Sequence, residues 1–283
     1  MEPSDGPGID ALMRNEAQTT AMSITTHYRH EIYQSLLAQH PGLFGVVATA
    51  PSSDGLAGMA TAFIDEASIG GRPSLTAHLE NLKVRHDVRR QGLGRQLADW
   101  RIQEARRRFG GEGVIVTMIE ASNTASLATA RGWQTQLLGP LRIVIARTSK
   151  RRPKADGTRV RPLDVGDIEA VVDGVNAYYD RYDLFPRQTP TGLAALLAPT
   201  SLGEPIRHYR VEVGADGTIL AGAAITERFK LMTDHIDGIP RPLELINRVA
   251  SILPPDHMIR SIELSLAWFA PGQSVAGRRL WDA

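Results

Sequence analysis

A strand, a glycine-containing turn and an amphipathic helix follow one another without a gap between residues 74 and 109. Residues 74–86 alternate in part between apolar and polar side chains, which predicts a β-strand. Residues 93–109 place apolar side chains at helical spacing, which predicts a helix packed against a sheet. Its apolar stripe consists of Leu97, Ala98, Ile102 and Ala105. This unit limits the chain to folds in which a tight turn lies directly at the N-terminus of a helix.

The turn reads Arg89-Arg90-Gln91-Gly92-Leu93-Gly94-Arg95 and contains the spacing Arg-x-x-Gly-x-Gly. The first N–H groups of a helix have no partner inside the helix and lie at the positive end of its dipole, so they bind anions. Glycines at 92 and 94 leave room for phosphate oxygens beside the backbone, and the arginines add positive charge. We therefore predict a diphosphate-binding site at this turn.

The rest of the chain is expected to form two halves, since 283 residues favour two domains. We expect a flexible N-terminus at 1–20, a first domain at 21–147, a basic polar linker at 148–157 and a second domain at 158–283. Both halves are predicted to run helix, hairpin, strand and helix start, which indicates a diverged internal repeat. The second copy lacks the elements that come after that helix in the first copy.

Within the halves, apolar spacing and turn residues locate the other elements. In the first half we expect a helix, a hairpin, a strand, a helix and a closing strand pair, at residues 21–40, 43–65, 114–119, 123–131 and 135–147. In the second half we expect an edge strand, a helix, a hairpin, a helix and a strand, at residues 158–161, 164–179, 208–226, 242–252 and 258–269.

Composition excludes several classes of protein. The 32 Lys and Arg against 31 Asp and Glu give a net charge of +1, which argues against nucleic acid as the main partner. The absence of cysteine excludes disulfides, thiolate nucleophiles and cysteine-ligated metals. His27 and His30 have no third ligand nearby, so no metal site is expected. With no apolar run suited to a signal peptide or a membrane span, we expect a cytoplasmic protein without a membrane partner.

The stretch from Leu79 to Leu97, with its flanks, resembles the GCN5-related N-acetyltransferase (GNAT) superfamily over about residues 22–147. The resemblance implies an α/β (α+β) fold. Its core is a mixed, mostly antiparallel sheet with a splayed central strand pair and flanking helices. A second, partial GNAT-like domain would follow, degenerate and without its own cofactor site.

The resemblance also implies where acetyl-CoA binds. In that family the splayed strand binds the pantetheine arm and polarises the thioester carbonyl, and the following loop wraps the diphosphate. The implied residues here are Leu82, Lys83, Val84, Arg89, Arg90, Gln91, Gly92, Leu93, Gly94 and Arg95. A second family motif resembles residues 114–133, so Asn123 is expected to contact the pantetheine arm and Ser126 the phosphates or the sulfur.

The transfer itself requires a neutral amine. For a lysine-like amine with a pKa of ~10.4, deprotonation at pH 7 costs ~4.6 kcal/mol, against ~1 kcal/mol for an α-amino group. A base is therefore needed for the first class of amine and optional for the second. Glu80, two residues before Leu82 on the splayed strand, is the first candidate for this base. Glu120, at the end of the next strand, is the second.

We expect an acetyl-CoA-dependent N-acetyltransferase acting on a primary amine of a small molecule or peptide, by direct transfer. An alternative is a non-catalytic acyl-CoA-binding or interaction module. It is favoured by the lack of the tyrosine that often protonates the leaving thiolate, since the corresponding region holds Thr129 and Ala130. A nucleic-acid binder is a third, less favoured interpretation. The strand at 258–269 would leave an uncovered sheet edge, which suggests a homodimer.

Overall fold

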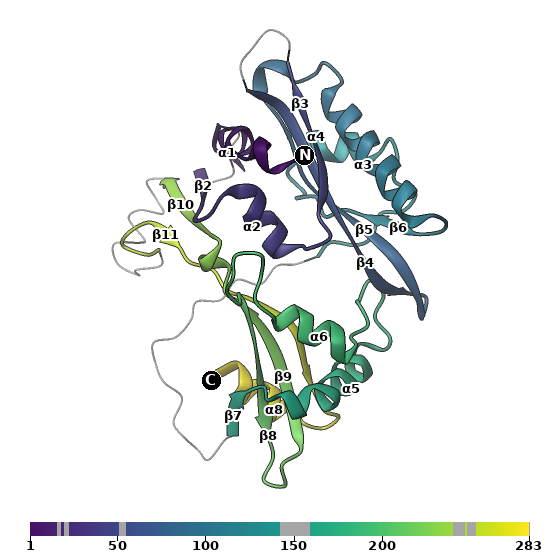
Figure 1. Ribbon diagram of the computed structural model, residues 1–283, viewed down its shortest axis with the longest axis vertical. Coiled ribbons are helices and arrows are strands. Elements are labelled where there is room, and N and C mark those ends of the chain that lie inside the picture. Colours follow the sequence, from purple (N-terminus) through teal and green to yellow (C-terminus); the bar gives the residue numbers. More distant parts are fainter. Residues whose placement is uncertain are drawn as a thin grey trace.

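The computed structural model describes residues 1–15, 18–19, 23–50, 55–141, 159–239, 247 and 253–282. These residues form three sheets with the strand orders β3-β4-β5-β6, β12-β9-β8-β7 and β1-β2-β10-β11. The first sheet belongs to the N-terminal half and the second to the C-terminal half. The third contains strands from both halves. Figure 1 shows the first half above the second, with the third sheet beside their junction.

The first sheet has the mixed, mostly antiparallel topology expected from the sequence. β3 (Phe44–Thr49), β4 (Leu56–Ile69) and β5 (Arg72–Val84) are antiparallel, and β6 (Val114–Val116) is parallel to β5. Helix α3 (Leu93–Phe109) has the bounds that the apolar stripe predicts, and that stripe is buried against the sheet. The predicted helix at 123–131 is α4 (Thr124–Ala130).

The N-terminal region differs from the expectation. Residues 6–15 form helix α1 (Gly6–Asn15), whose Ile9 and Leu12 are buried, so this part is not frayed. The helix expected at 21–40 forms only in the second part of that range. Strand β2 (Ser23–Tyr28) precedes helix α2 (Ile32–Gln39), in which Glu31 caps the N-terminus. A partner strand overrides the helical spacing of the apolar residues, because β2 pairs along its length with a strand of the second half.

The second half contains the predicted edge strand, helix and hairpin. These are β7 (Arg159–Pro162), α5 (Ile168–Tyr179), β8 (Arg207–Val213) and β9 (Ile219–Thr226). The hairpin turns at Asp216-Gly217, where Gly217 has φ +88°. Helix α6 (Pro190–Leu197) has no counterpart in the sequence analysis. Helix α8 (Ser274–Asp282) packs on β8 and β9, and its Arg279 donates to the buried Glu212 carboxylate.

The strand expected at 258–269 is divided into two. β11 (Met258–Ile259) pairs with β10 (Met232–Gly238), whereas β12 (Glu263–Phe269) pairs with β9. Residues 135–141 contain no strand. The rest of the expected closing strands, the linker at 148–157 and nearly all of the helix at 242–252 lie outside the described residues.

The two halves are joined by backbone pairing and by a buried apolar cluster. β10 from the second half is antiparallel to β2 from the first, and Arg29 N donates to Leu231 O at 2.9 Å. Ala38, Ile206 and Leu231 are each at most 2% exposed and pack together across the junction. At the far end of β4, the backbones of Ser68 and Leu184 are joined by a hydrogen bond of 2.8 Å. The two halves are therefore packed into one shared core at their junction.

We predict that Leu231→Ala destabilises the whole chain, because its fully buried side chain fills the junction. The expected loss is about 3 kcal/mol in the free energy of unfolding, the usual cost of emptying a buried leucine site. Urea denaturation followed by circular dichroism measures it. Val165→Ala, at a side chain that is 88% exposed, is the control and should change stability by less than about 0.5 kcal/mol. An equal effect of both variants would contradict a packed junction.

Candidate functional site

The strands β5 and β6 separate after a short stretch of pairing. Thr76, Ala77 and His78 pair with residues 114–116, and no described pair follows them. Beyond that point, a side-chain hydrogen bond replaces the backbone pairing of the two strands. Thr117 Oγ1 donates to Leu79 O at 3.0 Å. The end of β5, residues 79–84, is therefore splayed from its neighbour, as the sequence analysis expected. Leu82, Lys83 and Val84 all lie on this splayed segment.

A β-bulge bends β5 at the same place. The register with β4 shifts between the pairs Thr61–Glu80 and Met59–Lys83, and Asn81 has φ +49°. Asn81 Nδ2 donates to Thr61 Oγ1 at 3.1 Å, which satisfies the amide in this left-handed conformation. A bulge of this kind re-aims the side chains that follow and ends regular pairing.

The bulge is held from behind by a buried arginine of α3. Arg101 is 4% exposed, and its Nη1 donates to Glu80 O at 2.7 Å and to Thr61 O at 3.1 Å. Burial lowers the pKa of Arg101 to about 10, so it stays charged at neutral pH. Sequence reasoning missed this residue. A signal existed, because position 101 falls on the apolar stripe of α3, where an arginine is unexpected.

The glycine turn leaves the N-terminus of α3 open. Gly92 caps the helix with φ +86°, a conformation that suits glycine. Among the described residues, no protein atom accepts a hydrogen bond from the N–H groups of Leu93, Gly94 or Arg95, and the first helical bond runs from Gln96 N to Gly92 O. A Cβ at Gly94 would meet only Val84 Cγ2, at 3.6 Å. These amides have the exposure and direction that an anion needs.

The arginines of the turn do not all surround this position. Arg89 turns back toward the strand, where its Nε donates to Val84 O at 2.9 Å. Arg95 is 84% exposed, and its Nε lies 3.7 Å from the carboxylate of Asp99. Arg90 is exposed and has φ +62°. Gln91 folds onto the turn, with Nε2 donating to Asp87 O at 3.4 Å. Arg90 and Arg95 thus extend into solvent beside the open amides.

The second predicted motif lies at the start of α4. Asn123 Oδ1 accepts a hydrogen bond from Ser126 N at 3.0 Å and caps the helix. Its side-chain oxygen is thus already used, which the sequence analysis did not foresee. Thr129, at the place where the family often has a tyrosine, donates its hydroxyl to Ala125 O at 3.1 Å.

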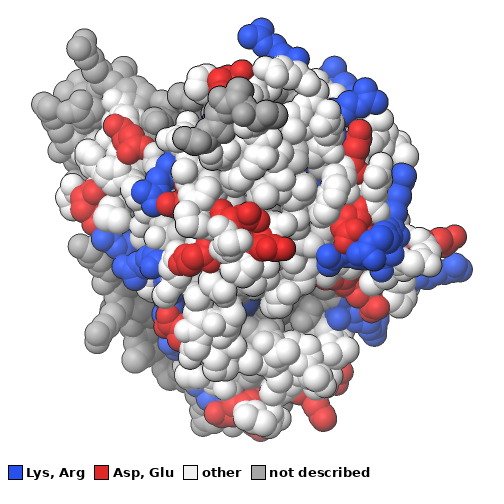
Figure 2. Space-filling model, turned by 45° about the horizontal axis from the view of Figure 1, so that its top comes forward, with Lys and Arg blue, Asp and Glu red and all other residues white. Residues whose placement is uncertain are grey.

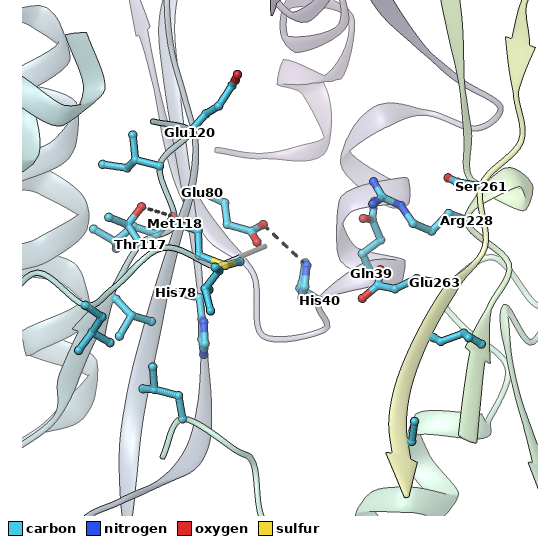
Figure 3. Close-up of a pocket in the computed structure, with 18 of the residues that line it drawn as sticks. Gln39, His40, His78, Glu80, Thr117, Met118, Glu120, Arg228, Ser261 and Glu263 are labelled. Atoms are coloured by element: carbon cyan, nitrogen blue, oxygen red, sulfur yellow. Dashed lines mark hydrogen bonds and ion pairs between the residues drawn. The ribbon is translucent and has the colours of Figure 1, made fainter. Parts of the chain in front are cut away.

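The splay opens into a large cavity lined by both halves. Figure 3 shows Glu80 pointing toward His40, which directly follows α2, while Arg228 and Glu263 extend from the second half. Glu80 Oε2 lies 3.7 Å from His40 Nε2. The His40 ring stacks on Phe63 at 3.9 Å between centroids, and Phe63 stacks on His78 at 4.6 Å. His40, Arg228 and Glu263 carried no sequence signal, because their proximity depends on the packing of the halves.

The environment of this cavity shifts the pKa values of Glu80 and His40. Burial raises the pKa of the Glu80 carboxyl, an effect that the neighbouring His78 and Arg228 oppose. Burial also lowers the pKa of His40 to about 4, assisted by Arg207. At neutral pH the His40 imidazole is therefore neutral, and the basicity of the Glu80 carboxylate is raised.

Glu120, the second candidate base, is less well placed. It is exposed and accepts a hydrogen bond from Ser122 Oγ at 2.7 Å. Figure 3 shows its carboxylate directed away from Glu80 and His40, although this residue also lines the cavity. The structure thus does not bring the two candidate bases together.

Three further features concern the surface and its chemistry. Figure 2 shows acidic side chains grouped near the middle of one face, and basic side chains along its right-hand edge with acidic ones among them. No helix in the described ranges combines the length and the apolar character needed to cross a membrane. Within the same ranges, no three His, Asp or Glu side chains are grouped as metal ligands.

Comparisons with known proteins agree with this geometry. Residues 10–133 match the acetyltransferase (GNAT) family. The match covers less than half of the chain, and over these residues the chain is similar to the GNAT family. Its members are acyl-CoA-dependent acetyltransferases, so an acyl-CoA co-substrate is implied. No curated protein matches the sequence.

Solved structures extend the likeness to the second half. Two structures of N-myristoyltransferase from Saccharomyces cerevisiae with bound myristoyl-CoA match with TM-scores of 0.53 and 0.51, both at 14% identity. These matches cover 83% and 82% of this chain, and 59% and 55% of the yeast chains. An aminoglycoside acetyltransferase from a soil metagenome matches 52% of this chain and 93% of its own, with 16% identity and a TM-score of 0.41. The yeast matches confirm the fold, a GNAT domain followed by a second GNAT-like sheet region.

We predict that acid destabilises the protein partly through His40. Its pKa falls from 6.5 in the unfolded chain to about 4 in the fold, so the unfolded chain binds the proton more tightly. Stability is then lost as the pH falls from 6.5 toward 4, by on the order of 2 kcal/mol after allowance for partial exposure. His40→Phe keeps the stack on Phe63 and should remove this loss. Urea unfolding at several pH values measures it, with His30→Phe as the exposed control. An unchanged pH dependence in His40→Phe would contradict the assignment.

Proposed function

We propose that the chain is an N-acetyltransferase that moves the acetyl group of acetyl-CoA to a primary amine of a small molecule or peptide. One observation carries the proposal. The open amides at the N-terminus of α3 lie at the end of the same splayed strand that places Glu80 in the cavity. Such a strand can connect a diphosphate at one end with an amine at the other.

The proposed acetyl-CoA site runs along the splayed end of β5. The diphosphate is bound by the N–H groups of Leu93, Gly94 and Arg95, with Arg90 and Arg95 adding charge from the solvent side. The pantetheine arm and the thioester lie beside Leu82, Lys83 and Val84. A fixed backbone N–H there stabilises the oxyanion, a contribution often worth ~3 kcal/mol. Ser126 is assigned a contact with the phosphates or the sulfur, as the resemblance implies.

In the proposed reaction Glu80 accepts a proton from the substrate ammonium, directly or through water. The freed amine attacks the thioester carbon, the carbon–nitrogen bond forms and the carbon–sulfur bond breaks. The nitrogen loses a second proton on becoming an amide. The leaving thiolate of coenzyme A takes up one of these two protons. Raised basicity of Glu80 supports this role, because a base works best when its pKa approaches the operating pH.

The alternative is a module that binds acyl-CoA without transferring the acyl group. It is favoured by the absence of a tyrosine hydroxyl at Thr129, whose own hydroxyl is bonded to the helix backbone. It is opposed by the position of Glu80, whose half-buried carboxylate lines the cavity beside His40. Thiol release from acetyl-CoA with a panel of amines separates the two, since the module would bind coenzyme A and release none.

We predict that Gly94→Leu weakens acetyl-CoA binding without destabilising the fold. The position is open in the protein, and leucine favours the helix by several tenths of a kcal/mol over glycine. The side chain would occupy the space beside the free amides, so affinity should fall at least tenfold by titration calorimetry. Gly111→Leu, at an open glycine in the turn that follows α3, is the control and should keep wild-type affinity. Wild-type affinity in Gly94→Leu would remove the proposed diphosphate site.

We predict that Glu80→Gln lowers kcat/KM for a lysine-like amine by about 100-fold or more, the usual contribution of a general base. The acidic limb of the wild-type pH profile should lie above the ordinary glutamate pKa, because burial raises the pKa of Glu80. Activity is then lost as the pH falls through that raised value. Glu120→Gln is the matched control and should change the rate less than about twofold. A larger loss in Glu120→Gln than in Glu80→Gln would assign the base to Glu120 instead.

A further inference from the structure

The cavity wall opposite Glu80 carries a cation that the proposed chemistry leaves unused. Arg228 begins the short turn Arg228–Lys230 that follows β9, and its guanidinium extends toward Gln39 at the end of α2. Both Arg228 and Glu80 line the same cavity. Figure 3 shows the two side chains approaching the space around His40 from opposite halves.

The backbone of this turn is fixed from two directions. Leu231 N donates to Arg228 O at 2.9 Å, and Phe229 N donates to Ser261 O at 3.2 Å. Leu231 itself is fully buried in the junction between the halves. The arginine is therefore attached to a rigid part of the fold, so its position in the cavity does not depend on a mobile loop.

The guanidinium has few protein partners for its five N–H groups. Nη2 approaches Met232 Sδ at 3.5 Å, a weak acceptor, and Nε is buried without any acceptor. In the described residues no carboxylate lies within ion-pair distance of Arg228, whereas Arg101, Arg161 and Arg279 all have oxygen partners. A buried donor without a partner is costly, so its retention calls for an explanation.

The charge of Arg228 reaches the proposed base. It lowers the pKa of Glu80 and that of Tyr28, both of which line the cavity. Glu263 extends from the same wall and acts on Glu80 in the opposite direction. The cavity therefore presents a cation and carboxylates together, an arrangement that complements a molecule with charges of both signs.

We propose that Arg228 binds an oxyanion group of the acceptor, so that the acceptor is a small amine that also carries a carboxylate or a phosphate. This inference rests on the proposed acetyl transfer. The guanidinium fork takes the oxyanion through paired N–H groups, and the amine of the same molecule is directed to Glu80. Arg228 is then a specificity-determining residue that binds the oxyanion of the acceptor, and its charge also acts on the pKa of Glu80 for every acceptor alike.

A competing explanation is that Arg228 only offsets the negative charge of Glu80 and Glu263. The two explanations differ in what they predict for acceptors without an anionic group. An offsetting charge influences every amine alike, through the basicity of Glu80. A binding site for the oxyanion influences only the acceptors that carry one.

The experiment compares three sets of amines by steady-state kinetics with the full chain and acetyl-CoA. The carboxylate set is glycine, β-alanine, γ-aminobutyrate and ε-aminocaproate, which also measures the preferred spacing. The phosphate arm is O-phosphoethanolamine. The neutral set consists of the amides of the same amino acids. The variants are Arg228→Gln and, as a matched control, Arg187→Gln, at an arginine of the same half that does not line the cavity.

We expect the wild type to prefer at least one oxyanion-bearing amine over its amide by tenfold or more in kcat/KM. Arg228→Gln should raise KM for that amine at least tenfold and leave the KM for amides within twofold. Any change in kcat, which would come from the charge of Arg228 acting on Glu80, should be the same for amines and amides. Arg187→Gln should match the wild type throughout. Equal losses on amines and amides, or no wild-type preference, would overturn the inference in favour of an offsetting charge.

A failure of the proposed acetyl transfer can be distinguished from a failure of the oxyanion site at Arg228. If acetyl-CoA binds and no amine is acetylated, transfer is refuted. Calorimetry with the same four amino acids and O-phosphoethanolamine then tests whether Arg228 binds an oxyanion. Binding to the wild type that is lost in Arg228→Gln supports the oxyanion site. Absence of binding in both, or equal binding in both, refutes it. Acetyl-CoA affinity unchanged by Arg228→Gln confirms that the variant is folded.

Discussion

The separation of β5 from β6 is the constraint on which the rest of the site depends. A regular ladder would satisfy the backbone of residues 79–84 and close the sheet. The bulge at Asn81 prevents this, and Arg101 stabilises the bulge by taking the carbonyls on either side of it, at the cost of burying a charged group. The strand is thereby left with backbone groups and side chains that face a cavity. Glu80 lies on this segment, and the open N-terminus of α3 follows it after residues 85–92.

The second half contributes the other wall. β10 leaves the second half to pair with β2, and the apolar cluster around Leu231 fixes the turn that carries Arg228. Because strands pair across the junction, the same core that stabilises the fold also fixes the position of one half relative to the other. The charges facing Glu80 are therefore positioned by burial and backbone hydrogen bonds. This explains how the second half can shape a site whose glycine turn lies in the first half.

Much of the first half could be predicted because its signals are local. The apolar stripe of α3 sets both ends of that helix, and Gly92 marks the turn because a left-handed residue is needed there. The same reasoning failed at residues 21–40, where Ile24, Tyr28 and Ile32 have helical spacing yet belong to a strand and a separate helix. The missing information was the partner strand, more than 200 residues away in the chain.

The sequence by itself determined the glycine turn, the helix that follows it, the position of Glu80 on the preceding strand and the likeness to the GNAT family. Each of these depends on residues close together in the chain, where period, propensity and unpaired amides act directly. Only the tertiary structure decided that His40, Arg228 and Glu263 share a cavity with Glu80, that Arg101 lies behind the bulge, and that Asn123 caps a helix. Those relations arise from packing between distant segments, and no local pattern records which distant segments will pack together.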